Sequence, residues 1–430
     1  MTATIGYGAV NRGAELTARW AAVALGFSIP ISVVLDSVLA LVVMLAWLLT
    51  ICCPGKHVPS LLGDRRAKQP DTIRTNPVAW LAAALFCLYL IGCVYSVGSQ
   101  EDMLNSLGKA ARLMFIPLLI IVFQDAATRR RAWSGFIGAM LLTLFLSYLL
   151  WLGLLPQGGI IRGDAANPVI FKLHITHNLF MAFTAFACTV QARYAATPRQ
   201  RGIWVALALL AAFNVLFMVQ GRTGHLVLLA LLVYMGIVWL RWKGVAIALA
   251  AIGVLAALTY ALPSSHLHQR AALAYHEFSA AQSNEAATMS SSVGLRMEFY
   301  RNTLEIVQQR PLLGAGTGGF RQAYAEQVRG SERVATHNPH NEYLMVAAQL
   351  GLTGLLLLLA LFAVQWHTAA QLPTMREQVL ARGMVLSIMV ASAVSSTLID
   401  HAEGWFYVWM SGLLFAALKS ATPIPETPYR

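Results

Sequence analysis

The stretch Thr336-His337-Asn338-Pro339-His340-Asn341-Glu342-Tyr343 stands where a long polar segment ends and an apolar run begins. The run 341–365 is long and apolar enough to cross hydrocarbon as a helix. Two imidazoles, two amides and a carboxylate at such a boundary cost desolvation energy unless they are hydrated or used. The pattern therefore suggests a proton-transfer site at the lip of a membrane-embedded cavity.

The composition of the whole chain indicates a membrane protein. Of 430 residues, 57% are hydrophobic and only 12% are charged, about half the charged share of a soluble protein. The apolar residues come in blocks of roughly 17–25, which predicts an all-α integral membrane protein. The net charge of +12 is explained by orientation in the membrane and by anionic partners, so no nucleic acid is expected.

We expect about twelve transmembrane helices and one long loop. Residues 1–262 would hold spans one to nine, 263–340 the loop, and 341–430 spans ten to twelve with a short tail. Pro30 is expected to break or kink the chain in the region of the first two spans. No cleavable signal peptide is evident after Arg19. The predicted spans are roughly 17–34, 36–53, 77–97, 106–124, 132–155, 175–193, 203–220, 223–240, 244–262, 341–365, 378–399 and 403–420.

Basic residues in the short loops predict the orientation. One set of loops is rich in them: Lys56, Arg65, Arg66, Lys68, Arg74, Arg129, Arg130, Arg131, Arg193, Arg199, Arg201, Arg241, Lys243 and Arg376. The opposite loops are sparser, with Lys109, Arg162, Lys172 and Arg222. Both termini are therefore expected on the cytoplasmic side, and the long loop on the outer side.

The long loop is expected to be partly helical. Arg270–Ala281 is rich in alanine, and Leu295–Gln308 has apolar residues close to helical spacing. Ser290-Ser291-Ser292 is a plausible start for the second helix. The segment Pro311–Phe320 is expected to be a flexible turn. It resembles a phosphate-binding glycine loop, but no Gly-Lys-Ser/Thr follows, so a nucleotide site is not expected.

Isolated cations on the outer side are candidates for binding an anionic substrate. Arg222 lies in Gln220-Gly221-Arg222-Thr223-Gly224-His225, where glycines would let a phosphate or sugar approach the backbone. The alternative is an arginine that snorkels at a helix end. Arg296 shares a helix face with Tyr300 but not with Arg301. Its guanidinium fork suits a diphosphate, while an ion pair with Glu298 or Glu332 is the alternative.

Two more polar clusters fall on the same side of the predicted topology. The first contains Arg162, Lys172, His174, His177 and Asn178, and the second contains Asp400, His401 and Glu403. Neither has the spacing of a metal site, so no metal is expected. The cysteines lie in or beside predicted spans and are interpreted as small apolar residues: Cys52, Cys53, Cys87, Cys93 and Cys188.

His340 is the candidate general base, because a histidine with a pKa near neutral can take a proton from an attacking hydroxyl. The alternative is a helix N-terminus with polar caps at a wet interface.

These motifs, in their order and on a common side, resemble the O-antigen ligase and polymerase superfamily. The resemblance rests on His340-Asn341 with nine residues before Gly351-Leu352-Thr353-Gly354, on Gly221-Arg222-Thr223-Gly224, and on Ser292-Val293-Gly294-Leu295-Arg296 followed by Pro311–Gly316. The motifs cover about residues 160–360, and the span layout covers the whole chain.

The resemblance implies a GT-C-like glycosyltransferase of the bacterial inner membrane. Its donor would be an undecaprenyl-diphosphate-linked glycan, its acceptor lipid A–core oligosaccharide, and its site would face the periplasm among membrane lipids. Twelve spans with one loop between the ninth and tenth favour a ligase. A polymerase or a protein O-oligosaccharyltransferase of the superfamily is the alternative. A lipid-linked glycan flippase is the alternative of another class.

The mechanism that the resemblance implies uses no metal ion and no cofactor. Arg222 and Arg296 would hold the diphosphate, and His340 would accept the proton of the acceptor hydroxyl, inverting the anomeric centre. Further candidates for binding or orienting substrate are Arg162, Lys172, His177, Tyr300, Arg301, His337 and Asn341.

Overall fold

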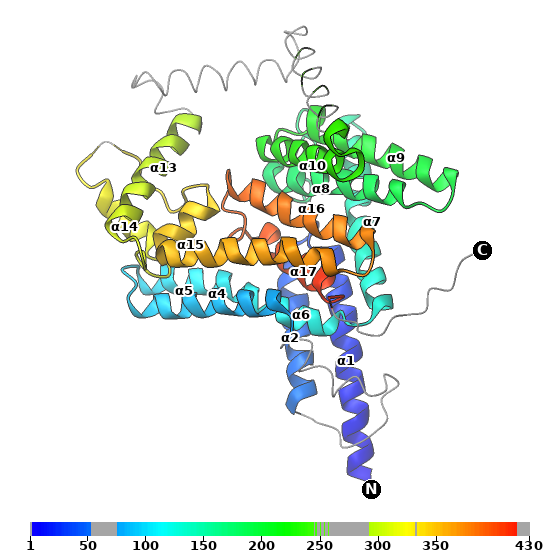
Figure 1. The fold of residues 1–430 in the computed structure, drawn as a ribbon, viewed down its shortest axis with the longest axis horizontal. Helices are drawn as coiled ribbons and strands as arrows, with labels where there is room; N and C mark the ends of the chain where they lie inside the picture. The colour runs from blue at the N-terminus through cyan, green and yellow to red at the C-terminus, as the bar shows by residue number, and fades with distance from the viewer. Residues whose placement is uncertain are drawn as a thin grey trace.

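The computed structural model describes residues 2–52, 75–244, 292–331 and 333–418, with isolated positions between 246 and 257. The chain is an all-helical, multi-pass membrane protein (Figure 1). Its N-terminal part contains α1 (Thr2–Ser28), α2 (Val33–Cys52), α4 (Pro77–Val94), α5 (Gln100–Ala110), η1 (Ala111–Met114), α6 (Phe115–Val122), α7 (Ala126–Trp151), α8 (His174–Arg193), α9 (Pro198–Phe213), η2 (Asn214–Met218) and α10 (Arg222–Leu240). Then follow α13 (Ser292–Gln309), α14 (Phe320–Gln327), α15 (Glu342–Thr368), η4 (Ala369–Gln371), α16 (Met375–Ser392) and α17 (His401–Phe415).

Seven helical segments of the described chain are long and apolar enough to cross a membrane. They are Val33–Cys52, Pro77–Val94, Gln100–Val122, Ala126–Trp151, Pro198–Met218, Arg222–Leu240 and Glu342–Gln371. The spans expected at 17–34, 175–193, 378–399 and 403–420 fall in α1, α8, α16 and α17, which are not among the seven. The span at 244–262 lies largely outside the described residues. The count of twelve therefore stays a prediction.

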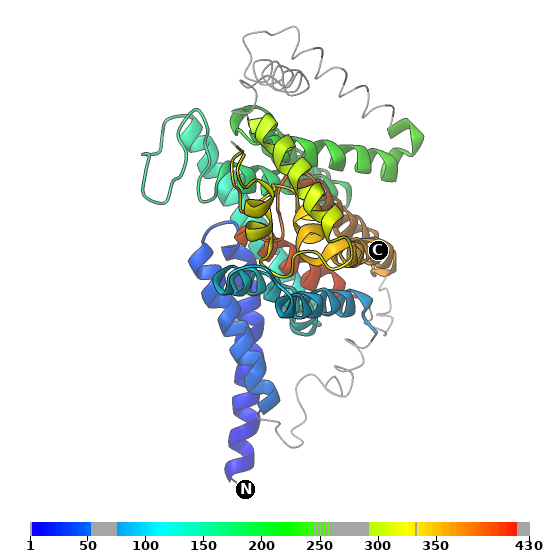
Figure 2. The same cartoon turned by 90° about the vertical axis from the view of Figure 1, so that its left-hand side faces the viewer.

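The first two helices form a hairpin that projects from the rest of the molecule (Figures 1 and 2). The break expected at Pro30 is confirmed, because α1 ends at Ser28 and α2 begins at Val33. α17 anchors the hairpin: the Trp409 indole donates to the Ala22 carbonyl at 2.8 Å. A Cβ on Gly26 would clash with the Trp409 ring, so this glycine permits the close contact.

The centre of the bundle is α17, which is buried along almost all of its length. A helix that is apolar all round is stable only when neighbours surround it. Phe406 contacts the rings of Phe180 and Phe136 at centroid distances of 4.9 and 5.6 Å, which joins α17 to α8 and α7. The N-terminal end of α17, with its polar residues, is thereby fixed within the bundle.

Helix α15 is broken at Gly351, which adopts φ 66° and ψ −168°. The segment Pro311–Phe320, called here the glycine turn, is seated in the break. Backbone groups that the broken helix cannot pair are satisfied by this turn. The bonds run from the amides of Ala315, Gly316 and Leu352 to the carbonyls of Ala348, Gln349 and Pro311, at 2.8, 2.8 and 2.7 Å. The expectation of a flexible turn was wrong, since its backbone is pinned on both sides.

Helix α13 precedes the glycine turn and helix α14 follows it. Both lie against the N-terminal part of α15 (Figures 1 and 2). The helix expected over Leu295–Gln308 is confirmed as α13. Helix α14 was not predicted. The helix expected at Arg270–Ala281 and the start at Ser290-Ser291 lie outside the described residues, as do the basic residues of the loop 54–74.

Candidate active site at the start of α15

His340 is held in a left-handed conformation, with φ 57°. Few residues other than glycine adopt it, and such strain gathers at functional sites. The Asn338 side chain accepts from the His340 amide at 2.8 Å, and the Asn341 side chain caps α15 through the Leu344 amide at 3.1 Å. These two bonds therefore fix the backbone on both sides of His340 at the start of α15.

Helix α13 supplies the other wall of the site. The Phe299 ring stacks on the His340 ring at a centroid distance of 6.3 Å. The Tyr300 hydroxyl donates to the His340 carbonyl at 3.2 Å. Arg296 lies one turn before Tyr300 on α13. Its positive charge is close enough to favour a lower pKa of both Tyr300 and His340. We call Arg296, Tyr300, His337, His340 and Asn341 the His340 cluster.

The environment of His340 disfavours the protonated imidazole. Its pKa is lowered from 6.5, first by burial and then by the positive fields of Arg296 and His337. A lowered pKa favours the neutral form at pH 7, which is the form that can accept a proton. The alternative ion pair of Arg296 with Glu298 is not among those of the described residues, and Glu332 lies outside them.

Arg301, also expected to bind substrate, lies apart from this cluster. Its Nε is 3.8 Å from Oε1 of Glu305, one turn further along α13, and its side chain is 75% exposed. The five-residue spacing from Arg296 predicted this separation. Its role as a substrate contact stays a prediction.

Arg222 begins α10 and is exposed. The glycines around it serve a packing purpose that the sequence analysis did not foresee. Cβ atoms on Gly221 and Gly224 would stand 2.6 and 2.5 Å from Asn178 atoms of α8. The Asn178 amide donates to the carbonyls of Val219 and Gly221 at 3.2 and 3.0 Å. The glycines therefore let α8 approach closely, and Asn178 fixes the turn that presents Arg222.

Arg162 lies near this turn, on a small exposed hairpin. Its amide donates to the Ile170 carbonyl at 2.9 Å, and the Asn167 side chain accepts from the Gln220 amide at 2.9 Å. His177 is buried instead, with Nε2 3.0 Å from Oδ1 of Asn214. That contact favours a packing role for His177, and its substrate contact stays a prediction.

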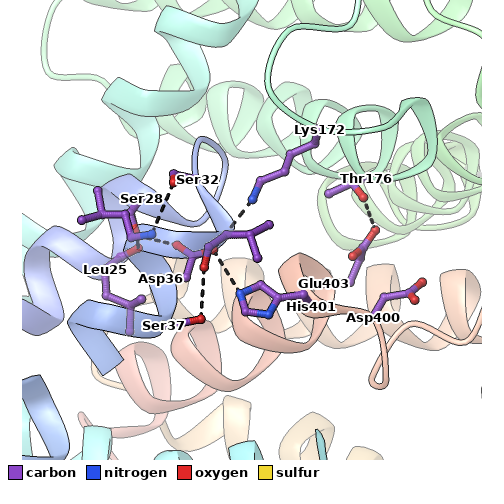
Figure 3. Close-up of polar contacts among 12 residues, drawn as sticks. Leu25, Ser28, Ser32, Asp36, Ser37, Lys172, Thr176, Asp400, His401 and Glu403 are labelled. Carbon is purple, nitrogen blue, oxygen red and sulfur yellow. Dashed lines mark hydrogen bonds and ion pairs between the residues drawn. The ribbon is translucent and has the colours of Figure 1, made fainter. Parts of the chain in front are cut away.

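Lys172 is buried beside Asp36 and His401 (Figure 3). The Lys172 ammonium and His401 Nε2 lie 3.8 and 3.6 Å from Oδ2 of Asp36. Burial lowers the pKa of Lys172, while Asp36 opposes the shift. Thr176 donates to Glu403 at 2.5 Å beside them. We call Asp36, Lys172, Thr176, His401 and Glu403 the Lys172 cluster. It ties α2, the loop before α8, the start of α8 and the start of α17 together.

The segment 393–403, which includes the link between α16 and α17, contacts both the start of α15 beside His340 and the Lys172 cluster. On one side the Ala393 carbonyl accepts from Asn341 at 3.0 Å, and the Leu398 amide donates to Glu342 at 2.9 Å. On the other side His401 and Glu403 belong to the Lys172 cluster. The convergence of Arg222 and His340 on one site stays a prediction.

Arg112 holds this segment in place and was missed by the sequence analysis. Its guanidinium donates to the carbonyls of Ile399, Asp400 and His401 at 3.3, 2.6 and 3.4 Å. The signal was present, because a charge inside the predicted span 106–124 needs a partner. Among the described residues, no group of three or more His, Cys, Asp or Glu could hold a metal ion.

Residues 207–359 match the O-antigen ligase family. This finding confirms the resemblance over the segment that carries Arg222, Arg296 and His340. The family implies a membrane enzyme that transfers glycans from a lipid-linked substrate. No curated protein matches the chain.

A solved structure described as "Structural coordination of polymerization and crosslinking by a peptidoglycan synthase complex" is also similar. The match covers 80% of this chain and 96% of that one, with 16% identity and a TM-score of 0.48. A likeness at this level carries no argument about this chain.

Proposed function

We propose that the protein is an O-antigen ligase. It transfers a glycan from undecaprenyl diphosphate to lipid A–core oligosaccharide at the periplasmic face of the inner membrane, with both termini cytoplasmic. The observation that carries this proposal is a strained His340 at the start of α15, beside Phe299, Tyr300 and Arg296 of α13. His340 can take a proton, while Arg296 stabilises negative charge.

The reaction is a single displacement. The acceptor hydroxyl attacks the anomeric carbon of the donor sugar while the bond from that carbon to the diphosphate oxygen breaks. The hydroxyl proton passes to His340, and the electron pair leaves with the diphosphate, whose charge Arg296 and Arg222 stabilise. Attack opposite the leaving group inverts the anomeric centre. The step uses no metal, because the two guanidinium groups neutralise the leaving group.

A polymerase or a protein O-oligosaccharyltransferase of the same family would use the same chemistry on another acceptor. The predicted layout of twelve spans with one loop, 263–340, favours the ligase, and the structure describes seven candidate spans of it. A flippase is the alternative of another class. Transporters place ionisable residues near the bilayer midplane on broken helices. Here His337 and His340 lie just before α15 begins, and Arg296 lies on α13, which is not among the candidate spans.

The test is transfer by the purified protein with both substrates in detergent, where no sealed vesicle exists. His340→Ala should reduce the rate by roughly 100- to 10,000-fold, and Arg296→Ala should also abolish transfer. The matched controls His367→Ala and Arg329→Ala change exposed residues that do not belong to the cluster and should retain full activity. Transfer should persist in EDTA. Normal rates for both cluster variants would exclude the mechanism.

Deletion in the source bacterium separates ligase from polymerase. A ligase deletion removes the whole lipopolysaccharide ladder and leaves carrier-linked polymer. A polymerase deletion leaves one repeat attached to the core.

A further inference from the structure

A cavity of about 240 Å³ lies beside the His340 cluster, between α4, α5, α14, α15 and α17. It is below the roughly 300–1,000 Å³ that holds a drug-sized ligand, so it suits one sugar unit of a larger molecule. His337 lines it, three residues before His340. Among the residues that the structure describes, its walls include none from α10 or α13, the helices that carry Arg222 and Arg296.

The cavity has buried walls and a more exposed polar rim. Its buried side chains include Tyr89, Met345 and Tyr407, together with the polar Glu342 and Gln349. The rim is a stripe along α5, formed by Asp102, Asn105, Ser106 and Lys109. This i, i+3, i+4, i+7 spacing places them on one face of the helix. Such a rim offers hydrogen bonds to sugar hydroxyls over a surface that suits the apolar face of a sugar ring.

Positive charge exceeds negative charge around the cavity. The guanidinium and ammonium groups are those of Lys109, Arg112 and Arg321, and the carboxylates are those of Asp102 and Glu342. Lys109 and Arg321 are exposed, so both can turn toward a ligand. Arg321 forms a long ion pair across the rim, since its guanidinium is 3.5 Å from Oδ1 of Asp102. A phosphate group on a ligand can bind the Arg321 guanidinium through two of its oxygens, at a shorter distance.

We propose that this cavity binds a phosphorylated sugar of the acceptor, with Lys109 and Arg321 holding its phosphate. The inference rests on the proposed function, in which Arg222 and Arg296 hold the donor diphosphate. A second anionic substrate then needs cations of its own, and the cavity supplies them beside the base. His337, in the same turn as His340, lines the wall that the sugar would face.

The test compares Lys109→Gln/Arg321→Gln with the control Arg310→Gln/Arg329→Gln, which also removes two exposed charges. With saturating donor, the first variant should raise the KM for phosphorylated acceptor by about 10- to 100-fold, with unchanged donor KM. Dephosphorylated acceptor should raise the KM of the wild type similarly, and the variant should add no further loss. A rise in donor KM instead, or no change in acceptor KM, overturns the assignment.

A binding measurement separates this proposal from the proposed function. Phosphorylated core oligosaccharide, without donor, is titrated into the full-length protein and followed by tryptophan fluorescence. Binding that needs Lys109 and Arg321 supports the cavity, even if the protein transfers no glycan and the ligase assignment fails. Transfer by a wild type whose binding does not depend on these two residues leaves the ligase standing and removes the cavity site.

Discussion

A Cβ atom on Gly351 would stand 2.2 Å from the carbonyl carbon of Leu312. The break in α15 and the glycine turn are thus one unit, in which each part satisfies the backbone of the other. The turn follows α13, which carries Arg296, and α15 follows His340. Seating the turn in the break therefore fixes the base and the arginine relative to each other.

Gly351→Ala tests this unit. The new methyl group meets the backbone of Leu312 in a left-handed conformation, so we expect a loss of about 2–4 kcal/mol in unfolding free energy. Thermal unfolding in detergent measures the loss, and transfer should fall with it. Gly138→Ala is the control, because nothing lies within 4 Å of its Cβ, and it should change stability by at most about 1 kcal/mol. Equal unfolding temperatures for both variants would contradict this account.

His337→Asn should shift the pH dependence of kcat/KM. The rate falls at low pH, because protonated His340 cannot accept a proton. Burial, Arg296 and His337 all lower the pKa of His340, so this acid limb lies below the ordinary histidine range. Removing the positive field of His337 raises the pKa, and the limb moves to higher pH. A limb that stays in place, or moves lower, would contradict the effect of His337 on the pKa of His340.

The sequence was enough for the parts of the site that local pattern controls. His340-Asn341 stands before an apolar run, so the capped start of α15 was predictable, as was the helix that places Arg296 and Tyr300 on one face. The family match to residues 207–359 covers the same motifs.

The rest depends on contacts between distant segments. Asp36 lies in the first turn of α2 and Lys172 follows α7, and Arg112 binds carbonyls at 399–401. Periodicity and spacing carry no information about such pairs. The packing role of the glycines beside Arg222 was not predictable for the same reason, because Asn178, which they allow to approach closely, belongs to another helix.

Tyr300→Phe should slow transfer without weakening donor binding. The variant loses the hydroxyl that donates to the His340 carbonyl at 3.2 Å, so the strained turn is less firmly held. A bond of this kind is worth about 0.5–1.5 kcal/mol, which predicts a roughly 2- to 10-fold lower kcat. Tyr148→Phe removes a similar bond, to the Leu210 carbonyl at 3.0 Å, and should leave kcat unchanged. A higher donor KM with unchanged kcat would assign Tyr300 to binding instead.

Asp36→Asn should destabilise the fold, and Lys172→Met should rescue it. The side chains of Asp36 and Lys172 are 0% and 8% exposed, so the single change leaves a buried ammonium without its counterion, at about 3–5 kcal/mol. The double variant removes both charges, so most of the loss should return in thermal unfolding. Activity then separates two roles for Lys172. If Lys172 only ties α2 to the loop before α8, the stable double variant transfers glycan normally, whereas a substrate contact would leave it stable and slow.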